Sequence, residues 1–161
     1  MKTKKVIAHL LVMAVFVSLL SGLAPLTSEA SPAGSWINDK GIWYFRLTNG
    51  RNLTGWLEIR GVWYYLHPNT YPVGKMATGR QYLPYENRYD WYYFDASSGA
   101  MVRGWHLYGG NWYYYRTGAN TPAGPSNGPG GSRLERGTWR IDGLLYDFDN
   151  GICKNPWNPR R

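Results

Sequence analysis

Three pairs of tryptophans recur in this chain at one fixed interval. Seven residues separate the members of each pair, which are Trp36 and Trp43, Trp56 and Trp63, and Trp105 and Trp112. An indole ring has an electron-rich face, and ring faces that meet at an angle attract a cation through the ring quadrupole. A quaternary ammonium suits such a cage because it has no hydrogen bonds to donate. The pairs therefore indicate aromatic cation-binding sites.

Each tryptophan pair lies in a segment typical of a β-hairpin. In residues 55–66, Trp56 opens a short strand, Arg60-Gly61 forms the turn, and Trp63-Tyr64-Tyr65-Leu66 is an aromatic run of high strand propensity. Alternate residues of a strand share a face, so Trp63 and Tyr65 are expected to point one way and Tyr64 the other. An isolated hairpin is marginal in water, so a chain that repeats it is expected to stack its hairpins.

The hairpin pattern occurs five times, and repeats of this kind dominate the organisation of a chain. The copies begin at Ser35, Gly55, Gly79, Gly104 and Gly137. The third copy has extra residues in its first half, and the fifth keeps only part of the pattern. No helical period of useful length follows residue 30. The sequence therefore predicts an all-β fold.

The composition predicts a core made of rings rather than of aliphatic side chains. The chain holds nine tryptophans and fourteen tyrosines among 161 residues, with a formal net charge of +8. The positive charge has two interpretations, an anionic partner such as a wall polymer or simple solubility. Without a recognition motif, nucleic acid is not an expected partner.

Residues 1–30 have the pattern of a cleaved secretory signal peptide. Lys2, Lys4 and Lys5 precede a mostly apolar stretch, and Ser28-Glu29-Ala30 has the form of a cleavage site. An uncleaved N-terminal anchor is the alternative. We expect a secreted, wall-associated protein that has no membrane span once the signal is removed.

The single cysteine, Cys153, has two interpretations. It follows a glycine loop in the same way as Met76 and Met101, which makes it a soft apolar residue between layers. A leftover cysteine in an exported chain could also form an intermolecular disulfide in a homodimer.

No metal site, cofactor or catalytic residue is predicted. His67 and His106 stand alone after residue 30, and no second cysteine is present to complete a zinc site. Glu86 and Asp90 are the one acidic pair considered for hydrolysis. The repeats, loop and tail leave no room for a separate catalytic domain.

The predicted organisation divides the chain into five segments. They are a signal peptide at 1–30, four repeats at 31–116, a Gly/Pro-rich loop or linker at 117–136, a degenerate fifth repeat at 137–155 and a tail at 156–161.

The repeated pattern resembles a known family. Gly-Trp, four residues, Gly-x-Trp-Tyr-Tyr, a glycine loop and x-Met together resemble the cell-wall or choline-binding repeat of Gram-positive bacteria and their phages, over roughly residues 34–155. The resemblance implies a β-solenoid of stacked hairpins. It also implies that ligand lies between consecutive hairpins, in a box of two tryptophans closed by a tyrosine of the next repeat.

The resemblance implies two complete boxes and one or two degraded ones. The first consists of Trp36, Trp43 and Tyr65, and the second of Trp56, Trp63 and Tyr93 with Met76 nearby. The third has Trp91 and Tyr114, with Met101 as its apolar residue, but Arg80 stands in its tryptophan position. The fourth has Trp105 and Trp112, with Asp147 in the position of the closing tyrosine.

The resemblance implies a non-catalytic module that attaches to choline-bearing teichoic acids or another wall polymer. Single cages bind weakly, and repetition supplies avidity. The first alternative is glucan binding, since related aromatic repeats stack on sugar rings. The second is a small wall-lytic enzyme.

Overall fold

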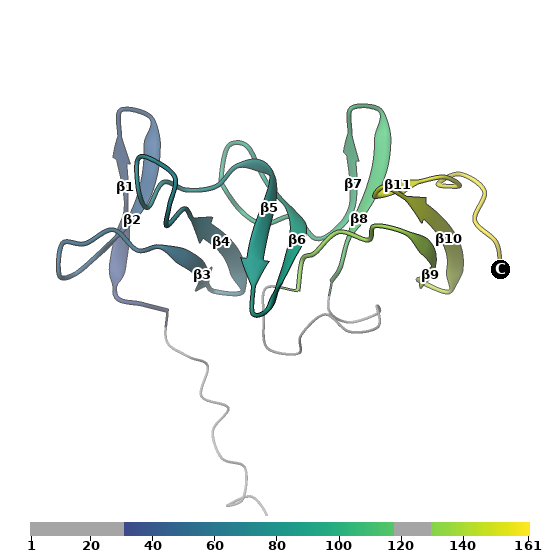
Figure 1. Ribbon diagram of the computed structural model, residues 1–161, viewed down its shortest axis with the longest axis horizontal. Coiled ribbons are helices and arrows are strands. Elements are labelled where there is room, and N and C mark those ends of the chain that lie inside the picture. The colour runs from purple at the N-terminus through teal and green to yellow at the C-terminus, as the bar shows by residue number, and fades with distance from the viewer. Residues whose placement is uncertain (1–30, 118–129) are drawn as a thin grey trace, which may run out of the picture. The chain divides into compact units, whose positions relative to one another are not determined.

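The chain forms antiparallel β-hairpins, one for each predicted repeat (Figure 1). The computed structural model describes residues 31–117 and 130–161. The strands are β1 Gly34–Asp39, β2 Ile42–Leu47, β3 Gly55–Ile59, β4 Val62–Leu66, β5 Gly79–Tyr85, β6 Arg88–Phe94, β7 Gly104–Tyr108, β8 Asn111–Tyr115, β9 Gly137–Ile141, β10 Leu144–Asp149 and β11 Ile152–Cys153. The all-β prediction is confirmed for this part of the chain.

The hairpin turns explain the fixed seven-residue interval. In β3–β4, Trp56 pairs with Tyr65 and Glu58 with Trp63, so a two-residue turn lies between the strands. Both turn residues have positive φ, 52° at Arg60 and 78° at Gly61. Two successive positive φ values define the turn that matches the right-handed twist of a hairpin, and glycine at the second position adopts it without strain.

Backbone hydrogen bonds connect each of the first three hairpins to the segment that follows the next hairpin. The Met76 amide donates to the Trp43 carbonyl, the Met101 amide to that of Trp63, and the Arg133 amide to that of Trp91, each at 2.8 Å. Because these bonds recur at the same place in successive repeats, they place one residue of each following segment beside the tryptophan of the preceding hairpin.

The core consists largely of rings, as the composition predicts. In four hairpins the residue that pairs with the opening glycine is buried, and these residues are Leu66, Phe94, Tyr115 and Phe148. Around Phe94 lie Tyr65, Ala77, Leu83, Tyr92 and Met101, with Trp56 and Trp63 packed against them. Ring contacts between neighbouring hairpins therefore replace a central aliphatic core.

The fifth hairpin packs against the fourth. Tyr114 of β8 shares a buried cluster with Leu134, Ile141, Phe148 and Cys153. Cys153 is buried and free in the described part of the chain. Its burial fits the interpretation of a soft apolar residue between layers.

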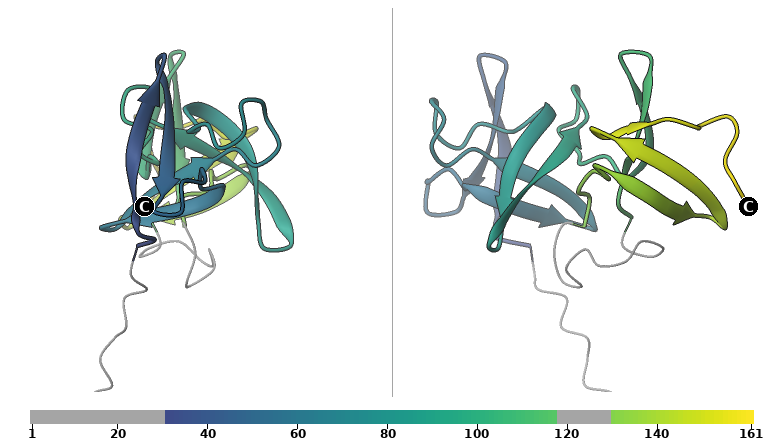
Figure 2. Two further views of the ribbon diagram at one scale, coloured as in Figure 1. Left: turned by 90° about the vertical axis from the view of Figure 1, so that its left-hand side faces the viewer. Right: turned by 45° about the vertical axis from the view of Figure 1, so that its right-hand side comes forward.

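The tail from residue 156 contacts the last sheet through one isolated bridge, between Arg160 and Leu145. Leu145 and Arg160 exchange two backbone hydrogen bonds, of 2.7 and 3.1 Å. The Arg160 guanidinium also pairs with the Asp147 carboxylate at 2.6 Å. The tail runs beside β9–β10 up to the C-terminus (Figure 2). The tail is irregular, as the sequence predicted, and these contacts hold it against β10.

Several predictions fall on residues that are not described. The signal peptide at 1–30 and most of the Gly/Pro-rich loop lie outside the described ranges. In the part that is described, no helix is long and apolar enough to span a membrane.

Candidate binding sites: aromatic cages between hairpins

The first cage lies between β1–β2 and the following hairpin. Trp36, Trp43 and Tyr64 line a cavity of about 250 Å³ together with Met76. The Trp36 and Tyr64 ring centroids are 4.9 Å apart, with an interplanar angle of 63°. Trp43 is 40% exposed, so its face is open to a ligand. Rings meeting at this angle provide the geometry that attracts a cation.

Tyr64 closes the first cage in place of the predicted Tyr65. Tyr65 is buried and packs 5.0 Å from Trp56 of its own hairpin. Directly paired residues share a face, so Trp56 and Tyr65 lie on one side of β3–β4 and Leu57 and Tyr64 on the other. A ring that closes the preceding cage must lie on the side opposite its own hairpin's tryptophans. Of the two tyrosines, only Tyr64 meets that requirement.

The second cage is built from Trp56, Trp63 and Tyr92. The Trp56 centroid lies 6.2 Å from Trp63 and 4.8 Å from Tyr92. Met101 is the sulfur-bearing residue of this cage, because its amide bonds to Trp63, whereas Met76 lines the first cage. The prediction had placed Met76 in the second box and Met101 in the third.

The stretched third hairpin adds a wall to the second cage. The Trp56 indole N–H donates to the Pro84 carbonyl at 2.8 Å, and the Tyr85 ring lies 6.3 Å from Trp56. Burial raises the pKa of Tyr92 well above its ordinary value, so its ring stays neutral. Trp56 therefore contacts rings of its own hairpin and both a ring and a backbone carbonyl of the next hairpin.

Tyr93 lies outside the second cage, contrary to the prediction. Its ring centroid lies 4.1 Å from that of His106, with the two planes tilted by 43°, and 5.7 Å from that of Tyr108. The reason is again the alternation of faces, because Tyr92 and Tyr93 point to opposite sides of β6. Tyr93 therefore contacts the fourth hairpin instead of the second.

The third cage holds two guanidinium groups of the chain itself. Arg80 lies 5.0 Å from the Trp91 ring centroid, and Arg133 lies 5.5 Å from both Trp91 and Tyr113. Arg133 is only 6% exposed. Its Nε and Nη2 donate to the two carboxylate oxygens of Glu135, at 2.7 and 2.8 Å. The predicted third-box residue Tyr114 lies elsewhere, 5.1 Å from Trp105.

The residue beside each cage is seated against a glycine of the following loop. A Cβ on Gly99 would overlap the Met76 sulfur, and one on Gly131 would lie 2.7 Å from the Met101 sulfur. A Cβ on Gly151 would overlap the Arg133 guanidinium. Arg133 therefore occupies in the third repeat the place that methionine occupies in the first two.

The fourth cage has more walls than the sequence predicted. Trp105 lies 6.2 Å from Trp112 and 4.7 Å from Tyr146. Trp157 of the tail stands 5.8 Å from Trp112 with an interplanar angle of 85°. With Pro156 these four rings line a cavity of about 210 Å³. Tyr146, rather than its neighbour Asp147, occupies the closing position.

Replacing Trp157 by alanine is expected to weaken cation binding at the fourth cage alone. The ring is 81% exposed, so the loss should be that of an exposed cation–π contact, about two- to fivefold in affinity, with the fold unchanged. The measurement is a choline titration followed through the indole resonances of Trp112 and Trp43. Equal weakening at both resonances would argue against a local role of the tail.

Acidification is expected to destabilise the fold through two half-buried histidines, His67 and His106. Burial lowers the pKa of His67 and of His106, and the His106 Nε2 has no hydrogen-bond partner in the described structure. The folded chain therefore binds fewer protons than the unfolded chain, in which the histidine pKa is about 6.5. The free energy of unfolding therefore keeps its full value above that pH and decreases as the pH falls below it.

Thermal denaturation at pH 7.5 and 5.5 tests this dependence. We expect a lower Tm at pH 5.5 and a smaller difference in a His67→Gln/His106→Gln variant. A wild-type Tm that is equal or higher at pH 5.5 would refute the assignment.

Five hairpins with ring cages between them define a repeat protein of the all-β class. The sequence matches the choline-binding repeat over residues 53–104 and 86–119, and a cell wall binding repeat over residues 34–51. The chain belongs to this family of choline-binding repeats. A search of curated proteins finds no match.

Several solved structures are similar to the chain. Choline-binding protein F from Streptococcus pneumoniae is 29% identical over 75% of this chain and 42% of its own, with a TM-score of 0.45. CbpJ from Streptococcus pneumoniae TIGR4 has the same identity and coverage, with a TM-score of 0.48. The choline-binding domain of Spr1274 is 36% identical over 44% of this chain and 82% of its own, with a TM-score of 0.33. The chain thus spans less than half the length of the first two.

Proposed function

We propose that the chain is a non-catalytic module that binds choline groups of a bacterial cell-wall polymer such as teichoic acid. The observation that carries this proposal is the first cage, where three rings of two hairpins surround an open cavity with Trp43 exposed. The fourth cage repeats the arrangement with Trp105, Trp112 and Tyr146. Membership of the choline-binding repeat family supports the same ligand.

Binding at several cages would give avidity for a polymer. A cation over an exposed ring contributes about 0.5–1 kcal/mol, so one cage of three rings is a weak site. A polymer with many choline groups could engage separate cages at once. In this proposal the chain is exported, its hairpins stack as a β-solenoid, and the protein stays attached to the wall.

Retention on an immobilised choline analogue tests the proposal. We expect the wild-type chain to be retained and to be released by free choline. A Trp43→Ala/Trp112→Ala variant, which removes one wall from each open cage, should pass through. The matched control is Tyr89→Ala, which removes an exposed ring outside the cages. Passage of the wild-type chain through the column would exclude the function.

Glucan binding is a second candidate, favoured by an exposed row of rings on the third hairpin. Tyr82 lies 5.5 Å from Tyr89 and 5.1 Å from Trp91, with interplanar angles of 33° and 43°. Such a tilted row offers a surface on which sugar rings could stack. A glucan pull-down that is insensitive to choline, and that Tyr89→Ala abolishes, would favour this function.

Wall digestion by the isolated chain tests whether the module is catalytic. In the acidic pair considered for hydrolysis, the Asp90 carboxylate lies 3.0 Å from the Arg88 guanidinium. Glu86 sits in the adjacent turn with a positive φ of 52°. We expect no release of wall fragments, and fragments that disappear in an Asp90→Asn variant would refute the non-catalytic proposal.

A further inference from the structure

One face of the third hairpin, β5–β6, carries a row of rings that ends at an arginine (Figure 1). In the register of this hairpin Tyr82 pairs with Trp91 and Pro84 with Tyr89, so these side chains share one face. The Tyr82 ring lies between the other two, 5.5 Å from Tyr89 and 5.1 Å from Trp91. The Arg80 guanidinium lies 5.0 Å from the Trp91 ring centroid, at the end of this ring row.

The two tyrosines of the ring row are open to solvent. Tyr82 is 55% exposed and Tyr89 is 58% exposed. Neighbouring exposed rings of this kind are typical of a binding surface. Each tyrosine also carries a hydroxyl that can donate or accept a hydrogen bond. Apolar ring faces with polar outer ends suit a pyranose sugar, which has an apolar C–H face and a rim of hydroxyl groups.

The charge of Arg80 is not neutralised by the protein. In the described part of the chain, Arg80 is exposed and makes no ion pair. The other guanidinium over Trp91, that of Arg133, is buried and donates to both carboxylate oxygens of Glu135. Asp90 lies on the opposite face of the hairpin, because it pairs with a residue of odd number on β5. The face that holds the ring row therefore presents one free positive charge.

The contact with Trp91 prepares Arg80 for a carboxylate. A guanidinium held over an indole ring has less conformational freedom to lose when it binds. Its planar fork of N–H donors matches the two oxygens of a carboxylate, and the two groups form paired hydrogen bonds. A carboxylate that reaches the end of the ring row would thus meet a donor already in position.

The ratio of rings to charge indicates how densely the ligand is charged. A nucleic acid carries a phosphate at each nucleotide, so bases stacked along the three rings would bring several phosphates toward a single guanidinium. A polysaccharide that alternates uronic acid with a neutral sugar carries one carboxylate for every two rings. The wider spacing of charge fits this face better.

We infer that this face of β5–β6 binds an acidic polysaccharide, with sugar rings against Tyr82 and Tyr89 and a uronate carboxylate against Arg80. The inference rests on the second candidate function, carbohydrate binding at the ring row, and adds the charge of the ligand to it. It does not depend on the choline cages, because neither tyrosine lines a cage.

One oligosaccharide in two charge states tests the inference on the full chain. The acidic form is a hyaluronan hexasaccharide, in which glucuronate alternates with N-acetylglucosamine, and the neutral form is the same chain with its carboxyl groups reduced to alcohols. The indole resonance of Trp91 reports binding at the ring row. At low salt we expect the acidic form to bind about two- to fivefold more tightly, the effect of an exposed charge pair. The preference should shrink as salt is added.

Arg80 variants give the decisive comparison. Arg80→Gln should reduce the preference to about onefold by weakening only the acidic form, whereas Arg80→Lys should retain a preference because the charge remains. Tyr82→Ala should weaken both forms alike. Arg51→Gln is the matched control, since it removes an exposed guanidinium from the loop after β2 and should keep the preference. An unchanged Tm shows that each variant is folded.

The outcomes separate this inference from the function on which it rests. Equal affinities for the two forms, or a preference that survives Arg80→Gln, would overturn the acidic site while carbohydrate binding stands. No response of Trp91 to either form would overturn carbohydrate binding at the ring row as well. Tighter binding of an oligothymidylate of the same charge would overturn the assignment to a polysaccharide. Retention on the choline column tests the cages independently of all three results.

Discussion

A Phe94→Ala variant is expected to lose about 3–5 kcal/mol of unfolding free energy. The Phe94 side chain is fully buried and packs with Tyr65, Tyr92 and Met101. Removing the ring leaves a cavity that these stiff neighbours cannot fill. Since small domains have about 5–15 kcal/mol in total, the loss is a large share of the stability.

Thermal denaturation measures this loss. We expect the Tm to fall by roughly 10–20 °C. Tyr89→Ala is the control, because it removes a ring of the same strand that is 58% exposed, and its effect should stay within about 1 kcal/mol. A Phe94→Ala variant with a Tm near that of the wild type would show that the ring cluster does not carry the fold.

The hairpins were predictable because their signals are local. Seven-residue tryptophan spacing, a turn such as Arg60-Gly61 and the alternation of one strand lie within a few residues of each other. Local propensity and turn geometry therefore agree with the structure, where two successive positive φ values close the β3–β4 turn.

The closing tyrosines were misplaced by one residue because they depend on contacts between hairpins. The alternation of Tyr64 and Tyr65 was clear from the sequence, but which face meets the preceding hairpin was not. In a strand a shift of one residue moves a side chain to the opposite face, so Tyr65, Tyr93 and Tyr114 all fall on the wrong side together. The consistent error shows that one choice of face governs every cage.

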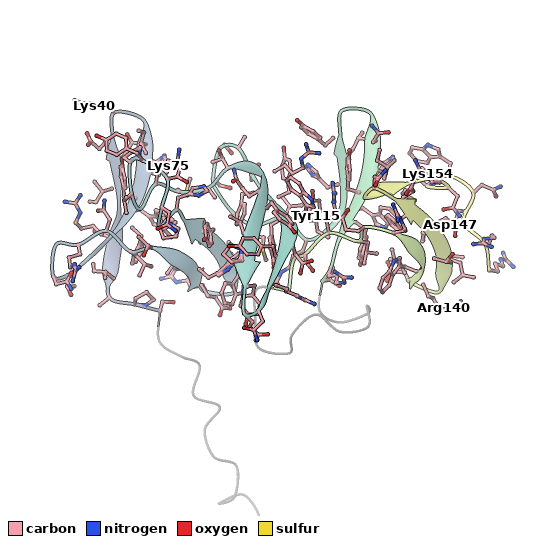
Figure 3. The ribbon with its side chains drawn as sticks, viewed as in Figure 1. Lys40, Lys75, Tyr115, Arg140, Asp147 and Lys154 are labelled. Carbon is pink, nitrogen blue, oxygen red and sulfur yellow. The ribbon has the colours of Figure 1, made fainter. Side chains whose placement is uncertain are left out.

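Two further residues at the cages were missed for different reasons. Arg133 could have been found, since Gly131-Ser132-Arg133 has the form of Gly99-Ala100-Met101 and Gly151-Ile152-Cys153. Trp157 had no comparable signal, because its place beside Trp112 depends on the tail bonding to β10 through Leu145 and Arg160. Figure 3 shows Asp147, the ion-pair partner of Arg160, beside this tail.

Replacing Arg133 by methionine is expected to open the third cage to an external cation. In the wild-type chain the Arg133 guanidinium lies over Trp91 and Tyr113 and so holds the position that a bound ammonium would take. Methionine fits the same kind of seat, since Met76 and Met101 approach Gly99 and Gly131 as closely as Arg133 approaches Gly151. The released Glu135 carboxylate is 44% exposed and remains solvated.

The new methyl group makes this expectation directly measurable. Choline should shift the methyl resonance of the introduced methionine in Arg133→Met. When Arg80→Trp also restores the missing ring, choline should bind about 0.5–2 kcal/mol more tightly. Arg140→Met is the control, because it removes an exposed guanidinium whose hydrogen bond goes to the Gly143 carbonyl of its own hairpin. If the introduced methyl does not respond to choline in either variant, Arg133 is a packing residue and not an internal substitute for the ligand. A response in both variants would mean that the Arg133 guanidinium decides whether the third cage binds choline. The number of cages that bind choline would then depend on the residue that packs against the loop glycine beside each cage.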